Sequence, residues 1–240
     1  MALYDELADK YNEIKDTLEH KYIFEPTLDK LFSGINKKDI IDLGCGDGKI
    51  DFEMIKRGAR KVVGVDNSKE QLKLAKTQGI ENCVFLQKDI FNDDLSSLGK
   101  FNLVTSFFVL HYAKNVGELE TAFESIYNLL ERGGKFFGTF SNPKKPELKT
   151  KKYGITCEVE GLFDGAKRTF TTYKNNKKHL SIDNYYWTKQ TYENSIKKAG
   201  FEKTTWKPLI PSEYAIKKFS KDFWKEAIES PYITSLTLEK

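Results

Sequence analysis

The residues with the clearest chemical potential lie near position 45, where three glycines follow a short apolar run. The run Ile40–Leu43 predicts a buried strand. Gly44, Gly46 and Gly48 come next, and a helical pattern starts after them. A strand, a glycine-rich turn and a helix start together predict a nucleotide-like ligand across the carboxyl end of the strand.

Two features of this turn bear on which ligand it takes. A dinucleotide fingerprint needs a glycine at the sixth place, and counting from Gly44 that place holds Lys49. Asp42 ends the strand in the mouth of the turn, where a carboxylate repels a diphosphate but attracts an ammonium group. S-adenosylmethionine carries an ammonium, a carboxylate and a sulfonium, and no phosphate. The turn therefore favours this cofactor over a dinucleotide.

The sequence Asp-Leu-Gly-Cys-Gly-Asp-Gly resembles the first motif of the class I S-adenosylmethionine-dependent methyltransferases. The resemblance implies that Asp42, Gly44, Cys45 and Gly46 contact the cofactor. The alternative is a tight strand-to-helix turn in another kind of α/β protein.

An acid after the second predicted strand, residues 61–65, suits a ribose. Asp66 stands about 20 residues beyond the glycine turn, where a ribose-binding acid belongs. Its carboxylate can accept hydrogen bonds from both ribose hydroxyls, and we assign Asn67 to the same contact. The alternative for Asp66 is capping of the next helix, but Ser68 already suits that role.

A second acid follows the third predicted strand, Cys83–Gln87. Asp89 can accept a hydrogen bond from the adenine amino group, and the apolar Ile90 can cover the ring. The alternative is a loop acid that faces solvent.

The fourth predicted strand, Phe101–Val109, is apolar almost throughout, as a strand covered on both faces should be. Ser106 and Phe107 lie near its carboxyl end, where backbone carbonyls can receive the methionine ammonium. His111 and Tyr112 follow, where a methyl acceptor would stand, and His111 is the candidate base with an ordinary pKa of about 6.5. The alternative is a structural histidine.

Two amphipathic segments, residues 4–14 and 18–32, precede the first strand, and Pro26 is expected to start a fresh helix. Such extensions fold over the cofactor in methyltransferases, and packing against the sheet edge is the alternative. We assign three of their aromatic residues to ligands, Tyr11 to the cofactor and Tyr4 and Phe24 to the acceptor.

The alternation of strands and helices breaks after the fifth predicted strand, Lys135–Ser141. A lysine-rich linker follows, which is compatible with an anionic acceptor. Residues 154–187 then hold three β-type runs separated by Asp164-Gly165 and Asn175-Asn176 turns, which predicts an antiparallel meander above the substrate edge. We assign Arg168, Tyr185 and Tyr186 of this meander to acceptor binding.

The whole pattern predicts one α/β domain, 1–240, with a Rossmann-like seven-stranded sheet that is mostly parallel and ends in an antiparallel strand. Residues 1–35 form an N-terminal helical lid, 36–142 and 188–240 the core, and 143–187 the inserted β meander. The opening Tyr-Asp-x-x-Ala-x-x-Tyr, Leu-His-Tyr-Ala and Tyr-Trp-Thr-Lys-Gln-Thr-Tyr are similar to small-molecule methyltransferases of the toxoflavin-synthase kind. That resemblance implies transfer to a nitrogen or oxygen of a small, heterocyclic acceptor.

Composition narrows the remaining choices. The net charge of +4 is too small to predict a nucleic-acid partner, and the three scattered cysteines show neither metal spacing nor a disulfide framework. We expect a cytoplasmic monomer or homodimer with no metal and no membrane segment. The sequence lacks the Asn/Asp-Pro-Pro-aromatic motif of base methyltransferases and the paired glutamates of arginine methyltransferases. A methyltransferase acting on RNA or protein, and a non-catalytic regulatory protein that binds S-adenosylmethionine, stay as alternatives.

Overall fold

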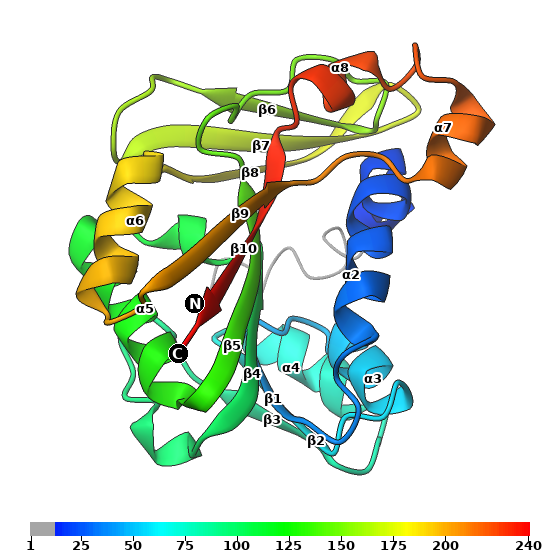
Figure 1. Ribbon diagram of the computed structural model, residues 1–240. Helices are drawn as coiled ribbons and strands as arrows, with labels where there is room; N and C mark the ends of the chain where they lie inside the picture. Colours follow the sequence, from blue (N-terminus) through cyan, green and yellow to red (C-terminus); the bar gives the residue numbers. More distant parts are fainter. Residues whose placement is uncertain (1–12) are drawn as a thin grey trace.

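The computed structural model describes residues 13–240, so the predictions for Tyr4 and Tyr11 lie outside the described residues (Figure 1). A seven-stranded sheet in the order β3-β2-β1-β4-β5-β10-β9 forms the centre. Strands β1 to β5 pair in parallel, whereas β10 is antiparallel to both β5 and β9. The strands of this sheet are β1 (Asp39–Leu43), β2 (Lys61–Asp66), β3 (Cys83–Gln87), β4 (Phe101–Phe107), β5 (Leu130–Ser141), β9 (Lys203–Pro208) and β10 (Ile233–Glu239).

Helices cover both faces of the sheet because successive residues of a strand point to opposite sides. Ile41 packs in a core with residues of α5 and α6, and its neighbour Ile40 packs in a second core with residues of α2 and α3. Figure 1 shows α5 and α6 on one side of the sheet and α2 and α3 on the other. The helices are α2 (Glu25–Phe32), α3 (Lys49–Lys56), α4 (Lys69–Lys76), α5 (Val116–Leu129), α6 (Lys189–Lys198), α7 (Glu213–Phe219) and α8 (Lys225–Glu229).

Pro26 lies in the first turn of α2, as predicted, but the chain before it stays helical. The preceding turn, η2 (His20–Phe24), is a π-helix in which the Glu25 N–H donates to the His20 carbonyl. Proline lacks an N–H and its ring crowds the carbonyl four residues earlier, so a wider turn relieves the conflict. The π-helix lets one helical path run from residue 18 to residue 32.

The predicted meander is confirmed as a separate antiparallel sheet of β6 (Ile155–Val159), β7 (Ala166–Lys174) and β8 (Lys177–Tyr186). Asn175 and Asn176 have φ values of +51° and +61° and make the two-residue turn between β7 and β8. Figure 1 shows this small sheet above the carboxyl ends of β1 and β4, together with α7 and α8. Tyr153 stacks on Trp224 at 4.7 Å between ring centroids and ties the meander region to α8.

The α5 helix begins at Val116, because the side chain of Asn115 accepts a hydrogen bond from the Glu118 N–H. Ser220 has a φ of +84° and separates α7 from α8. Within residues 13–240 no helix is long and apolar enough to cross a bilayer.

Candidate active site

The glycine turn after β1 has a backbone that other residues rarely adopt. Gly44, Gly46 and Gly48 have φ values of +83°, +55° and +74°. A Cβ at Gly44 would stand 2.2 Å from the Val109 side chain, so this position also needs glycine for close packing. A Cβ at Gly46 would meet its nearest atom only at 4.0 Å, which leaves open space beside this backbone.

Asp42 lies behind the turn and is 1% exposed. Its Oδ1 accepts a hydrogen bond of 2.7 Å from the Thr105 hydroxyl. Burial raises the pKa of Asp42 to about 7; the Thr105 hydrogen bond opposes the shift and the nearby Asp66 adds to it. A cation placed against Asp42 would stabilise the ionised carboxylate.

Asp66 ties the glycine turn to the end of β2. Its Oδ2 accepts from the Gly46 N–H at 2.9 Å, and its Oδ1 accepts from the Ser68 N–H at 2.8 Å. Ser68 in turn caps α4, as predicted, by accepting from the Gln71 N–H. The acid assigned to the ribose therefore lies directly beside the turn, while its neighbour Asn67 is exposed.

Asp89 and Ile90 lie at the end of β3. The Asp89 carboxylate accepts from the Phe91 N–H at 2.9 Å and from the Asn92 side chain at 3.1 Å, so it also stabilises its own loop. Ile90 is 5% exposed and belongs to the core beneath α5.

One cavity joins the glycine turn to the meander, with an empty volume of about 1090 Å³ measured out to its open mouth. The cavity gathers nine of the residues assigned from the sequence: Phe24, Asp42, Gly44, Cys45, Gly46, Phe107, His111, Tyr112 and Arg168. Seven others do not line it: Asp66, Asn67, Asp89, Ile90, Ser106, Tyr185 and Tyr186.

Ser106, Tyr185 and Tyr186 have structural contacts in this conformation, as Asp66, Asp89 and Ile90 do. Ser106 is fully buried and its hydroxyl donates to the Leu43 carbonyl at 2.9 Å. The Tyr186 hydroxyl donates to the Pro143 carbonyl at 2.8 Å, and Tyr185 packs against the α5 core. Their side chains hold the linker and the sheet together at the margin of the cavity.

His111 follows β4, lines the same cavity and is 5% exposed. Burial, and then the positive charge of Arg168, hold the pKa of His111 well below 6.5. Its Nδ1 is buried and has no hydrogen-bond partner among the described residues. The imidazole is therefore neutral at physiological pH and has a nitrogen available to a ligand.

Arg168 of β7 reaches the cavity from the meander and is 6% exposed. Its guanidinium donates from Nη1 to Asn184 Oδ1 of β8 and from Nη2 to Cys157 Sγ of β6, both at 3.1 Å. Within residues 13–240 no carboxylate lies in ion-pair range of it, and its buried Nε has no partner. Burying an unpaired charge costs on the order of several kcal/mol, so this arrangement favours a bound anion.

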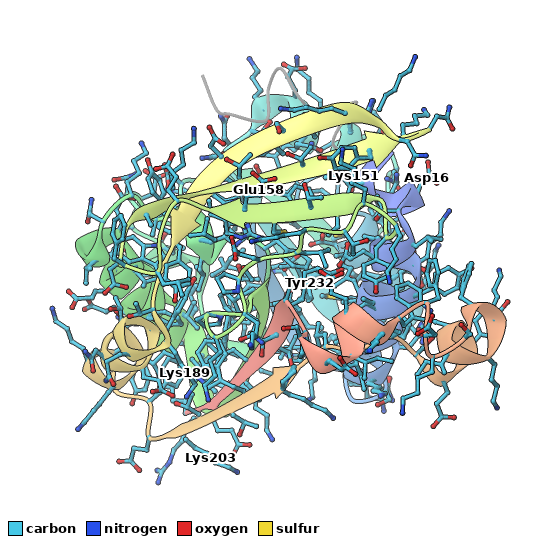
Figure 2. All side chains as sticks on the ribbon, turned by 90° about the horizontal axis from the view of Figure 1, so that it is seen from above. Asp16, Lys151, Glu158, Lys189, Lys203 and Tyr232 are labelled. Atoms are coloured by element: carbon cyan, nitrogen blue, oxygen red, sulfur yellow. The ribbon has the colours of Figure 1, made fainter. Side chains whose placement is uncertain are left out.

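The sequence analysis missed several polar residues that face the cavity. Glu19 is 4% exposed, and burial raises its pKa to about 8. Tyr232 precedes β10 near the middle of the view in Figure 2, and burial followed by the charge of Glu19 raises its pKa. The buried atoms without a hydrogen-bond partner among the described residues include six from residues that line the cavity: Glu19 Oε1, Gln71 Oε1, His111 Nδ1, Ser141 Oγ, Arg168 Nε and Tyr232 Oη.

Among these missed residues, only Glu19 lies in a local sequence pattern that could have identified it. It is an acid on the apolar side of the segment 18–32, four residues before the buried Ile23. Ser141, Asn184 and Tyr232 lie far apart in the chain and meet through the tertiary fold alone.

The sheet order, the antiparallel β10 and the glycine turn that opens into a cavity define a methyltransferase fold. Comparison with known proteins agrees. The family model described as a methyltransferase domain matches residues 36–207. The crystal structure of an S-adenosylmethionine-dependent methyltransferase from Mesorhizobium loti aligns with a TM-score of 0.64 at 19% identity, over 93% of this chain and 98% of that one.

Two curated relatives add detail. The chain is 32% identical over 124 residues to the ubiquinone biosynthesis O-methyltransferase of Nitrosomonas europaea, which is 49% of this chain and 50% of that protein. It is 25% identical over 181 residues to the N-demethylindolmycin N-methyltransferase of Streptomyces griseus, which is 73% of this chain and 74% of that protein. For other curated relatives that it matches, the chain spans 39% and 46% of their length.

The chain belongs to the methyltransferase-domain family. It holds an S-adenosylmethionine-dependent methyltransferase domain, of enzyme class EC 2.1.1, whose methyl donor is S-adenosylmethionine. The residues present fit that donor, because buried Asp42 has no countercharge among the described residues and the open space at Gly46 admits a ligand against the backbone.

Proposed function

We propose that this domain transfers the methyl group of S-adenosylmethionine to a nucleophilic nitrogen or oxygen of a small molecule, by in-line displacement in an enclosed site. The observation that carries the proposal is the single cavity that runs from the glycine turn to the unpartnered polar atoms of Glu19, His111, Arg168 and Tyr232. The O- and N-methyltransferases among the relatives support a small acceptor, and the toxoflavin-synthase resemblance supports a heterocyclic one.

When bound, S-adenosylmethionine supplies a methyl group that its sulfonium already activates. The chain's own residues bind and orient the two reactants. Asp42 is assigned to the ammonium, the backbone at Gly44 and Gly46 to the methionine part, and Asp66 to the ribose. Asp89 and Ile90, which follow β3, are assigned to the adenine. Fixing the reactants in line contributes roughly 7–11 kcal/mol toward the barrier.

Aromatic side chains keep water out of the proposed reaction site. Phe24 and Phe108 both line the cavity, with ring centroids 5.2 Å apart. Phe108 has a φ of +59°, a conformation that is costly for a non-glycine residue and that turns the chain sharply after β4. A dry site favours the reaction because positive charge leaves the sulfur as the transition state forms.

Glu19 is the proposed base for substrates whose methyl-accepting atom must lose a proton. Its pKa of about 8 makes its carboxylate a stronger base than the imidazole of His111, whose pKa lies well below 6.5. His111 and Tyr112 are then contacts that orient the acceptor. This assignment moves the base from the residue expected in the sequence to one brought in by the N-terminal helix.

Calorimetry with S-adenosylhomocysteine, followed by a tritiated methyl-transfer screen over small acceptors, RNA and protein, tests the proposal. We expect micromolar-range binding, severe weakening in Asp66→Ala, and transfer to small molecules only. Unchanged affinity in Asp66→Ala would refute the ribose role. Labelling of RNA or protein alone would show that the domain methylates a macromolecule. Binding without any transfer would show a non-catalytic protein that binds S-adenosylmethionine.

The base assignment has its own test. Glu19→Gln should lower kcat by about 100-fold or more, remove a rise of activity through about pH 8, and leave the affinity for S-adenosylhomocysteine unchanged. Glu25→Gln is the matched control, because Glu25 follows on the same helical path but is exposed and pairs with His20. Equal activity of Glu19→Gln and the wild type would show that Glu19 is not the base, and His111 or solvent would then be the proton acceptor.

A further inference from the structure

We propose that the methyl acceptor carries a carboxylate group and that Arg168 binds this group. Arg168 is then the residue that selects the acceptor. The inference rests on the proposed function and adds a substrate class to it. It is carried by a buried guanidinium that faces the cavity without a countercharge in the described part of the chain.

The guanidinium of Arg168 is held in place before any ligand arrives. The register of the meander sets Arg168 of β7 opposite Asn184 of β8, and Cys157 of β6 lies on its other side. A guanidinium has five N–H donors. Asn184 Oδ1 and Cys157 Sγ take two of them, so three remain, among them the Nε–H. This geometry offers the paired N–H groups that a planar carboxylate accepts.

The charged side chains that line the cavity indicate that the bound anion carries a single negative charge. Among the described residues that line it, Arg168 is the only lysine or arginine. One fixed cation matches a single negative charge, and a phosphate would want more donors and charges than this wall provides.

The walls around Arg168 favour an apolar body attached to the carboxylate. Phe108, Phe170, Ile155 and Ile182 line the same cavity. Flat rings pack well against such walls. The acceptor class is therefore an aromatic or heteroaromatic carboxylate that also bears the nitrogen or oxygen to be methylated.

The cofactor's own carboxylate is a second possible source of the anion, and the position of Arg168 argues against it. The charge of Arg168 acts on His111, Cys157 and Tyr192. The acids around the glycine turn, where the methionine part is assigned, act on one another instead. Arg168 comes from β7 of the meander and Asp42 from β1 of the central sheet, so the two charges enter the cavity from different sheets.

The lysine-rich linker suggested an anionic acceptor for a different reason, and its lysines do not line this cavity. Lys151 stacks on the Tyr173 ring at 4.8 Å, and Figure 2 shows it beside Asp16 near the edge of the molecule. The expectation of an anionic acceptor therefore rests on the buried Arg168 and not on the lysines of the linker.

The test compares matched acceptors and matched variants. Hydroxybenzoates, aminobenzoates and pyridine carboxylates are offered beside their carboxamides to the wild type, Arg168→Gln, Arg168→Lys and Lys167→Gln. Lys167 is the control because it directly precedes Arg168 in β7. Its side chain is exposed on the outer face and pairs with Asp183 at 2.8 Å. We expect Arg168→Gln to lower kcat/KM for carboxylates by roughly 30-fold or more, and carboxamides and Lys167→Gln to change little.

A binding measurement on the wild type keeps the proposal testable where the variants fail to fold. With S-adenosylhomocysteine bound, benzoate should bind detectably by calorimetry and benzamide at least about tenfold more weakly. Preference for benzamide, or transfer to carboxamides alone, would overturn the inference while leaving the proposed function intact. Lost affinity of Arg168→Gln for S-adenosylhomocysteine, with carboxylate preference unchanged, would assign the guanidinium to the cofactor. Absence of S-adenosylhomocysteine binding in the wild type would instead overturn the proposed function.

Discussion

At the scale of single residues, the site depends on carboxyl groups whose charge changes near neutral pH. Asp42 is the clearest case, because it is buried at the mouth of the glycine turn and its pKa is about 7. Only the ionised form attracts an ammonium group. The cofactor site is therefore expected to respond to pH in a range where most aspartates do not.

We predict that the affinity for S-adenosylhomocysteine rises between pH 6 and pH 7.5 as Asp42 ionises. Asp42→Asn should bind more weakly, by about 10-fold to 100-fold at pH 7.5, and should lose this pH dependence. Thr105→Val removes a hydrogen bond that favours the ionised form, so it should move the rise to higher pH. Calorimetry across the pH range checks all three, and a flat wild-type profile would contradict the role of Asp42.

Sequence reasoning identified the glycine turn with Asp42, but only part of the other residues that line the cavity. Asp42 and Gly46 form a local motif in which neighbours in the chain are neighbours in space. Glu19 and Tyr232 stand more than 200 residues apart, and each has its role only because the fold buries it beside the other. No spacing rule could connect them. The ligand roles assigned to these residues stay predictions.

At the scale of elements, the turn after β1 depends on a left-handed backbone and on close packing against the end of β4. Gly44 combines both requirements, since its φ is +83° and a Cβ would stand 2.2 Å from Val109. Gly79 has a φ of +57° but nothing within 4 Å of an added Cβ. The two positions separate the cost of the backbone conformation from the cost of the clash.

We predict that Gly44→Ala lowers the free energy of unfolding by about 3 kcal/mol and Gly79→Ala by only about 1 kcal/mol, measured by urea denaturation. The excess in Gly44→Ala should appear with a loss of affinity for S-adenosylhomocysteine. Equal destabilisation by the two substitutions would show that Val109 moves aside without cost.

Elements could be predicted from the sequence where local patterns set them. Ser68 begins its helix as expected, because its side chain accepts from the Gln71 N–H, and Thr188 begins α6 in the same way. The Asn175-Asn176 turn follows from residues that tolerate positive φ. The π-helix before Pro26 could not be foreseen, because the chain had two ways to accommodate a proline, to end the helix or to widen it, and packing of Ile23 and Phe24 decides between them.

At the scale of the whole molecule, three buried acids favour their protonated forms in the folded chain. Burial raises the pKa of Glu19 to about 8, of Asp42 to about 7, and of Asp51 well above 3.8. Asp51 is fully buried and neither carboxylate oxygen has a partner among residues 13–240. Above pH 5 the unfolded chain releases these protons while the folded chain keeps them, so folding becomes less favourable as pH rises.

We predict that the ligand-free protein loses stability between pH 5 and pH 8, at up to about 1.4 kcal/mol per pH unit for each acid that only the folded chain keeps protonated. Asp51→Asn should reduce this slope and be more stable than the wild type at pH 8. Asp222→Asn, at an exposed position, is the control and should follow the wild type. Urea denaturation at a series of pH values measures the slope, and stability that increases toward pH 8 would contradict the argument.

The order of the strands also fixes when the acceptor site can exist during synthesis. Strand β10 lies between β5 and β9, and Tyr232 and Ile233 at its beginning help to wall the cavity. The glycine turn is therefore translated long before Tyr232 and Ile233. A nascent chain then has the residues of its donor pocket while the acceptor pocket still lacks one wall, so we expect methyl transfer only after Tyr232 and Ile233 have joined the cavity.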